Sequence, residues 1–173
     1  MEPYIELSRL VNLERLYKRE LSYSLKATPD EADALAQRFG IVRINKFEAE
    51  YHVEASRTAY KGYYLTARIQ AEVIQNCIVT LKEVPEKIDC EFNFHVIDQR
   101  YNQESFDDQN IQEDIEFSSE DVVDLGEISA QYLSLFLNPY PRSIDVCDQK
   151  MEDSEDLSSK KTNPFSVLKA LKS

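Results

Sequence analysis

Apolar and polar residues alternate with a period of two along four segments of the chain, the pattern of strands that have one buried face. These segments are 20–27, 44–55, 63–73 and 86–96. In the second of them Phe47, Tyr51 and Val53 alternate with charged residues and a histidine. One apolar and one polar face per strand predicts an antiparallel sheet with one side in water. Residues 56–62 join two long strands, so we expect a hairpin tip in which Gly62 adopts a positive φ.

Helical periodicity appears in three other places. Thr28-Pro29-Asp30-Glu31 has the form of a capping box, and the helix that follows ends at Gly40. A second helix is predicted from Asp124, with Glu127 as its capping partner, to Leu137. We expect its apolar face, which turns toward the core, to consist of Leu125, Ile128, Tyr132, Leu135 and Phe136. A third, short helix is predicted from Pro164. The sequence therefore predicts an α+β fold in which an antiparallel sheet carries the first two helices on one face.

Charge is concentrated in two parts of this 173-residue chain. The formal net charge is −12, of which residues 98–127 contribute −10 and residues 143–156 contribute −5. We expect one domain over 1–142 that includes a flexible acidic loop at 99–119, and a flexible acidic tail over 143–173 that ends in the short helix. Neither a membrane-spanning run nor a secretion signal is visible, so we expect a cytoplasmic protein without a membrane partner.

The residues that usually carry chemistry are sparse. The three cysteines are odd in number and lack CxxC spacing, which argues against a disulfide framework or a zinc ribbon. His52 and His95 fall on the outward positions of their strands, and we expect Cys77 and Cys90 to be small core residues. The three glycines form no phosphate-binding loop. We therefore predict no catalytic residue, no metal, no cofactor and no small-molecule substrate.

Two groups of basic residues are candidates for contact with RNA or with a protein partner. At the predicted hairpin tip an aromatic ring stands between two cations, a combination that suits stacking on a base beside the RNA backbone. Near the C-terminus four lysines accompany the apolar positions of the short helix. Ordinary solvated side chains are the alternative for both groups. The candidates are Arg57, Tyr60, Lys61, Lys160, Lys161, Lys169 and Lys172.

Three motifs stand apart from the periodic pattern. They are residues 75–85 (QNCIVTLKEVP), residues 123–127 (VDLGE) with 138–142 (NPYPR), and residues 163–168 (NPFSVL). Their order and spacing resemble the YceD-like family of large-ribosomal-subunit RNA accumulation proteins, in the form typical of alphaproteobacteria, over nearly the whole chain. The matching positions are Cys77, Leu81, Pro85, Asp124, Leu125, Glu127, Pro139, Pro164 and Phe165. Some members carry a second cysteine where Thr80 stands here, so no metal site or cysteine-pair function is carried over.

The resemblance implies a noncatalytic factor that supports synthesis, processing or stability of large-subunit 23S rRNA. Two modes of action stay open. The protein binds the rRNA or its precursor directly through its basic residues, or it is an acidic chaperone or adaptor that holds a basic ribosomal protein without RNA contact. The acidic loop mimics nucleic-acid charge in the second mode, and a shield against nonspecific RNA or a plain solvated linker are its other interpretations. A nuclease that uses Asp107, Asp108 and Asp114 with Mg²⁺ is a distant third hypothesis.

Overall fold

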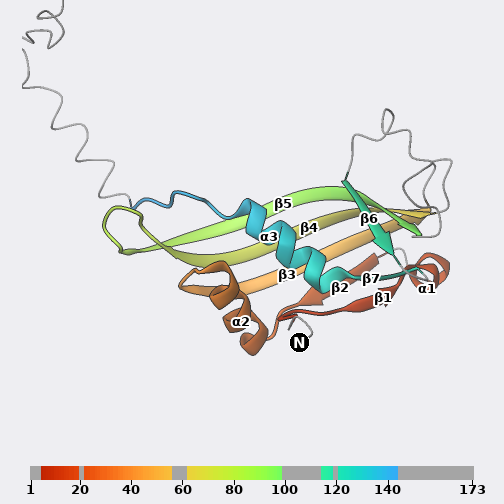
Figure 1. Cartoon of the computed structure of the whole chain (residues 1–173), viewed down its shortest axis with the longest axis horizontal. Coiled ribbons are helices and arrows are strands. Elements are labelled where there is room, and N and C mark those ends of the chain that lie inside the picture. The colour runs from red at the N-terminus through yellow and green to blue at the C-terminus, as the bar shows by residue number, and fades with distance from the viewer. Residues whose placement is uncertain (1–4, 20–21, 56–61, 99–113, 119–120, 144–173) are drawn as a thin grey trace, which may run out of the picture.

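The computed structural model describes residues 5–19, 22–55, 62–98, 114–118 and 121–143 (Figure 1). The strands in these ranges are β1 (Leu10–Asn12), β2 (Ser22–Lys26), β3 (Arg43–Ala55), β4 (Gly62–Asn76), β5 (Glu83–Asp98), β6 (Asp114–Ser118) and β7 (Val122–Asp124). The helices are α1 (Leu13–Arg19), α2 (Pro29–Phe39) and α3 (Leu125–Phe136). This set of elements confirms the α+β class predicted from the sequence.

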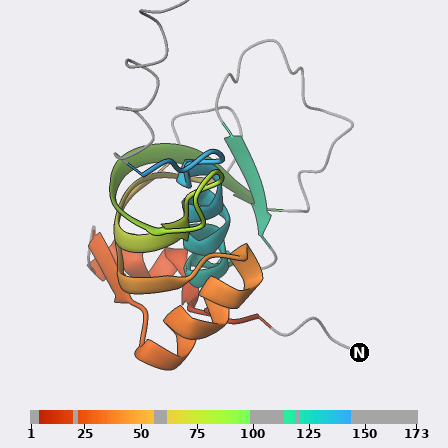
Figure 2. The ribbon, with the colours of Figure 1, turned by 90° about the vertical axis from the view of Figure 1, so that its left-hand side faces the viewer.

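Five strands form the main sheet in the order β2-β3-β4-β5-β6, and the sheet curves around α3 (Figure 2). The pairs from β2 to β5 are antiparallel, as predicted. The last pair is parallel, with Phe94 opposite Asp114 and Asp98 opposite Ser118. The sequence pattern predicted neither β6 nor its parallel pairing with β5. A two-stranded antiparallel ribbon of β1 and β7 completes the topology.

The core lies between the curved sheet and the two longer helices. Alternate residues of β3 and β4 are buried, including Phe47, Tyr51 and Leu65, as the period-two pattern predicts. On α3 the buried face is formed by residues such as Leu125, Ile128, Ala130 and Leu133. The last turn of α3 departs from the prediction: Leu135 and Phe136, expected to face the core, are exposed. Leu135 follows Leu133 by two residues, which is about 200° around a helix, so both cannot face the core.

The turns around α2 follow the sequence prediction. Thr28 and Glu31 form a complete capping box, and Gly40 ends the helix with φ +66°. Gly62 differs, because its φ is not positive. A Cβ at Gly62 would lie 2.4 Å from the carbonyl oxygen of Val96, so close approach of β5 is the reason for this glycine.

Part of the predicted flexible acidic loop is a strand. Residues 114–118, assigned to that loop, form β6. Residues 99–113, as well as the tail from 144 onward and its predicted helix, lie outside the described residues. In the described part of the chain, no helix has the length and apolar character needed to cross a membrane.

Candidate partner-binding surface

Two motif segments more than sixty residues apart meet where β4 turns into β5. Here we call residues 75–83 together with 138–143 the hairpin corner. The backbone N–H of Ile78 donates to the carbonyl of Pro141 at 2.9 Å. The Gln75 amide nitrogen donates to the carbonyl of Asn138 at 3.0 Å. These bonds hold the chain that leaves α3 against the turn, so the first motif and the end of the second motif form one structure.

The Cys77 side chain is the centre of the hairpin corner. Its Sγ accepts the backbone N–H of Thr80 at 3.4 Å and that of Ser143 at 3.3 Å, and the residue is 0% exposed. Hydrogen bonds from Thr80, and then from Ser143, lower the pKa of the Cys77 thiol to about 6, although burial opposes this shift. Cys77 is therefore a buried residue, as predicted, but one whose sulfur ties two segments together.

Leu81 occupies a backbone conformation that leucine rarely adopts. Its φ is +59°, and its N–H donates to the carbonyl of Cys77 at 2.9 Å, which closes one helical turn. A left-handed residue with a Cβ costs roughly 1–2 kcal/mol, which is why glycine usually fills this place. Leu81 is nevertheless 76% exposed. Burial in the described structure therefore does not compensate for this strain.

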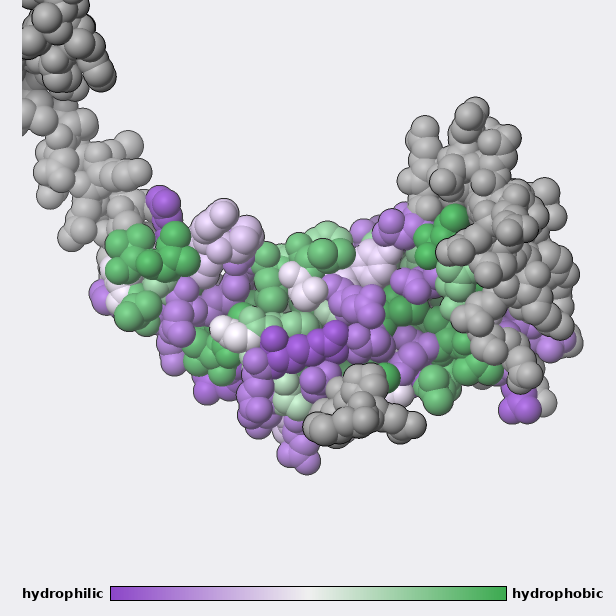
Figure 3. Space-filling model, in the orientation of Figure 1, coloured by the Kyte–Doolittle hydropathy of each residue, from purple (hydrophilic) through white to green (hydrophobic). Residues whose placement is uncertain are grey.

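The hairpin corner presents apolar side chains to solvent. Figure 3 shows hydrophobic surface at the end of the molecule where β4 and β5 turn. The last turn of α3, which precedes residue 138, adds two further side chains. The exposed apolar residues are Ile78, Val79, Leu81, Leu135, Phe136 and Tyr140. A rigid frame with exposed apolar side chains has the character of an interaction surface.

Two prolines of the motifs, Pro85 and Pro139, lie close in sequence to this turn. The sequence predicts that the strand turns at Pro85, whereas the structure places Pro85 inside β5, opposite Ile74. The turn itself spans residues 77–82. Proline is tolerated there because β6 accompanies β5 only from Phe94 onward, so Pro85 lies on an edge.

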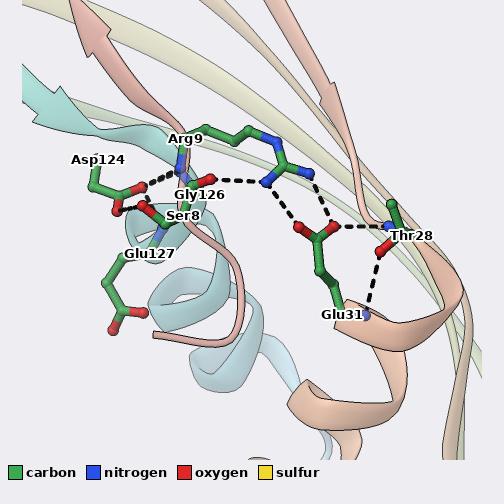
Figure 4. A network of polar contacts seen from close by, with 7 residues as sticks. All are labelled: Ser8, Arg9, Thr28, Glu31, Asp124, Gly126 and Glu127. Atoms are coloured by element: carbon green, nitrogen blue, oxygen red, sulfur yellow. Dashed lines mark hydrogen bonds and ion pairs between the residues drawn. The ribbon is translucent and has the colours of Figure 1, made fainter. Parts of the chain in front are cut away.

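The first half of the second motif has a structural role at the opposite end of α3 (Figure 4). Asp124 is the N-cap of α3, as predicted, and its Oδ1 accepts the N–H groups of Gly126 and Glu127. The same carboxylate accepts the N–H of Arg9 at 2.7 Å and the Ser8 hydroxyl at 2.6 Å. Asp124 thus joins the N-terminal segment to α3.

Two bidentate ion pairs extend this network to α2. Arg9 binds both oxygens of Glu31 at 2.8 and 2.9 Å, and this contact lowers the pKa of Glu31. Arg38 binds both oxygens of Glu127 at 2.8 and 2.7 Å. The predicted role of Glu127 as capping partner was wrong, since its carboxylate faces α2 instead. Nothing in the sequence indicated these roles for Arg9 and Arg38, because Glu31 and Glu127 lie 22 and 89 positions away from them.

The solvent-facing side of the sheet is mixed in charge, and its central cations have carboxylate partners. Arg68 forms a bidentate pair with Asp89, with both distances 2.7 Å. Three lysines on the same side each lie within 2.9 Å of a glutamate oxygen. These pairs are Lys26–Glu48, Lys46–Glu48 and Lys87–Glu72. Such a surface offers an RNA backbone few uncompensated positive charges.

The two histidines differ in their exposure to solvent. His52 is exposed, with Nε2 3.5 Å from Glu54, as the pattern predicts. His95 is only 8% exposed, although its position was expected to face solvent. His95 has neighbours on both sides: Ile115 of β6 lies opposite it, and the ring of Tyr64 on β4 lies 5.0 Å from the imidazole. Among the described residues, no group of three or more histidine, cysteine or acidic side chains is arranged to hold a metal ion.

The basic candidates from the sequence are not tested by this structure. Those at the hairpin tip fall between β3 and β4, and the lysines fall in the C-terminal tail. All of them lie outside the described residues, together with two motif residues. These positions are Arg57, Tyr60, Lys61, Lys160, Lys161, Pro164, Phe165, Lys169 and Lys172.

The chain matches a known family over more than half of its length. Residues 65–172 match the YceD family model, which is described as large ribosomal RNA subunit accumulation protein. The matched part begins within β4 and contains the hairpin corner, the Asp124 cap and α3. No curated protein and no solved structure matches the chain. The resemblance of residues 1–64 to the family stays a prediction, as does the alphaproteobacterial type.

Proposed function

We propose, because the chain belongs to the YceD family of large ribosomal RNA subunit accumulation proteins, that it is a noncatalytic factor in biogenesis of the large ribosomal subunit. It supports synthesis, processing or stability of 23S rRNA, and it acts in the cytoplasm where that subunit is assembled. The observation that carries the proposal is the match over more than half of the chain, which includes both motif segments of the hairpin corner.

Protein binding is the mode of action that the described surfaces support better. The solvent-facing side of the sheet pairs its central cations with carboxylates. A surface of this kind suits a protein partner such as a basic ribosomal protein more than an RNA backbone. Direct RNA contact through Arg57, Tyr60 and Lys61, or through the C-terminal lysines, is the second mode.

The noncatalytic role is part of the proposal. Asp114 is one of the three acids of the nuclease hypothesis, and its Oδ2 accepts the Tyr132 hydroxyl at 2.6 Å. That bond fixes β6 against α3 and gives Asp114 a structural explanation. Neutralising Asp107, Asp108 and Asp114 should therefore leave rRNA processing unchanged, provided the variant folds. Loss of an RNA-cleaving activity in this variant would support the enzyme hypothesis instead.

The deciding experiment is a pull-down of the tagged full-length protein from cytoplasm, with and without RNase. A basic ribosomal protein that stays bound after RNase supports the adaptor mode. Large-subunit RNA that is bound, and whose digestion releases its proteins, supports direct RNA binding. If neither 23S rRNA nor any large-subunit protein is enriched, the ribosomal proposal is wrong.

Charge-reversal variants separate the two modes further. Arg57→Glu with Lys61→Glu should abolish RNA capture in the direct mode and leave capture unchanged in the adaptor mode. The matched control is Lys26→Glu with Lys87→Glu, which changes the net charge equally on the solvent-facing side of the sheet. An equal loss in both variants would indicate a general charge effect rather than a contact at the hairpin tip.

A further inference from the structure

The apolar surface of the hairpin corner is rigidly presented and uncovered in the part of the chain that the structure describes. Ile78, Val79 and Leu81 are between 48% and 76% exposed, and Tyr140 is 70% exposed. The backbone bond from Ile78 to Pro141 and the two N–H bonds to the Cys77 sulfur fix these residues in place. Exposed apolar side chains on a fixed backbone, together with the strained conformation of Leu81, indicate that another segment or molecule binds to this surface.

The chain itself supplies an apolar segment close to this surface. The described residues end at Ser143, whose N–H is bonded to Cys77, so the C-terminal tail departs from the hairpin corner. Within that tail, residues 163–173 carry Asn163 and Pro164 as helix-start signals. Apolar residues follow at Phe165, Leu168 and Leu171, on one side of a helix. Eleven residues are too few for a stable isolated helix in water, so this segment needs a surface to fold on.

The connection has the length to allow this contact. Residues 144–162 number nineteen, and their polar, acidic composition predicts a flexible linker. A flexible linker of that length spans roughly 25 Å between its ends. A linker of this kind holds a tethered segment at an effective concentration on the order of millimolar. Weak intrinsic affinity is therefore sufficient for the segment to stay bound for most of the time.

We propose that residues 163–173 of this same chain dock as a short amphipathic helix on the apolar surface formed by Ile78, Val79, Leu81 and Tyr140. The third motif would then join the first motif and the end of the second in one structural unit. The proposal does not depend on the ribosomal assignment, because both the surface and its occupant belong to one chain.

Nuclear magnetic resonance of the ¹⁵N,¹³C-labelled full-length protein tests the contact. Residues 164–171 should show helical Cα shifts, and Phe165→Ser with Leu168→Ser should abolish those shifts and move the amide signals of residues 78–81. The perturbations should be independent of protein concentration. Effects that disappear on dilution would assign the surface to a second copy, and unchanged signals at 78–81 would show that the segment does not bind there. Either result overturns the proposal.

A surface variant gives the reciprocal test. Leu81→Asp changes an exposed residue, so the fold should persist, as dispersed core signals will verify. The helical shifts of residues 164–171 should collapse in this variant. Leu10→Asp is the matched control, because Leu10 is 72% exposed on β1 and lies outside the hairpin corner. Helical shifts that survive Leu81→Asp, or that collapse equally in Leu10→Asp, would contradict docking at the hairpin corner.

Discussion

Arg38 on α2 and Glu127 on α3 form a bidentate ion pair across 89 positions of sequence, with both distances below 2.9 Å. Arg38 also reaches Glu6 at 3.0 Å, so one guanidinium joins the N-terminal segment and both longer helices. The contact lowers the pKa of Glu127 and raises that of Arg38. A motif residue that looks like a local helix cap therefore fixes the relative position of two helices.

Breaking this pair should destabilise the protein in a pH-dependent way. A double-mutant cycle of Arg38→Met and Glu127→Gln should give a coupling energy of about 0.5–1 kcal/mol, because both side chains are partly exposed to solvent. The folded-state pKa of Glu127 is depressed, so its stabilising contribution is present above the unfolded-state pKa and is lost as the pH falls through the folded-state pKa. Urea unfolding at pH 7 and in acid measures both effects.

The control for that cycle is Asp33→Asn, which removes an exposed carboxylate from α2. It should change the free energy of unfolding by less than about 0.5 kcal/mol. A coupling energy near zero at pH 7, or one that grows in acid, would contradict the role assigned to Arg38 and Glu127.

Gly126 should not tolerate alanine although it lies in a helix. Alanine usually stabilises a helix by about 1 kcal/mol relative to glycine. At Gly126, however, a Cβ would lie 2.6 Å from the Leu7 carbonyl oxygen and 2.9 Å from the Arg9 nitrogen, and both are backbone atoms. Gly126→Ala should therefore lower the free energy of unfolding by about 1–3 kcal/mol, as overpacking does. Chemical unfolding measures this change.

Ser134→Ala is the matched substitution on the exposed side of α3. Helix propensity should make it neutral or stabilising by a few tenths of a kcal/mol. If Gly126→Ala stabilises the protein as much as this control does, the N-terminal segment does not approach α3 as the structure has it.

Local patterns predicted the long elements because each has one face that must be buried. The alternation around Phe47 and Leu65 and the capping box at Thr28 correspond directly to β3, β4 and α2. Short elements lacked such a pattern. β6 is acidic and five residues long, and β1 and β7 have three residues each, so their pairing partners decide their structure.

The candidate surface was harder to predict, because hydrogen bonds between residues far apart in the sequence leave no pattern in the local spacing. Cys77 and Ser143 are bonded although they are 66 positions apart. Glu127 stands three residues after Asp124, a spacing that fits a capping box, whereas the structure uses Glu127 in an ion pair with Arg38. The motifs marked these residues as candidates. The structure supplies the contacts that explain the first and the second motif, and the third motif lies outside the described residues. The basic tip at Arg57 and Lys61 stays a prediction.

Cys77 should make stability depend on pH in the neutral range. Its pKa in the folded protein is about 6, below the ordinary thiol value of roughly 8.5. A depressed pKa contributes stability that is present above the unfolded-state pKa and is lost as pH falls through about 6. Under reducing conditions, the free energy of unfolding of the unchanged protein should rise from pH 6 to pH 8.5 relative to that of Cys77→Ser.

Cys90→Ser provides the comparison, because burial raises the pKa of Cys90 and its thiol stays protonated in this range. Its pH profile should therefore run parallel to that of the unchanged protein from pH 6 to about pH 7.5, below the range in which the unfolded-state thiol ionises. A parallel profile for Cys77→Ser as well would mean that the sulfur does not accept the N–H bonds of Thr80 and Ser143 as a thiolate would.

Leu81→Gly should stabilise the hairpin corner itself. Glycine adopts a φ near +59° without the steric cost that leucine bears, and the side chain lost is mostly exposed, so the gain should be roughly 0.5–1 kcal/mol. If residues 163–173 dock on Leu81, loss of its side chain would also remove a docking contact and lower the stability. The free energy of unfolding should therefore be measured in the Phe165→Ser/Leu168→Ser variant, in which docking is abolished. Val79→Gly, in the same turn but without a positive φ, should instead lose a similar amount. A loss of stability in both glycine variants would show that Leu81 carries no backbone strain, and its outward position would then need another explanation.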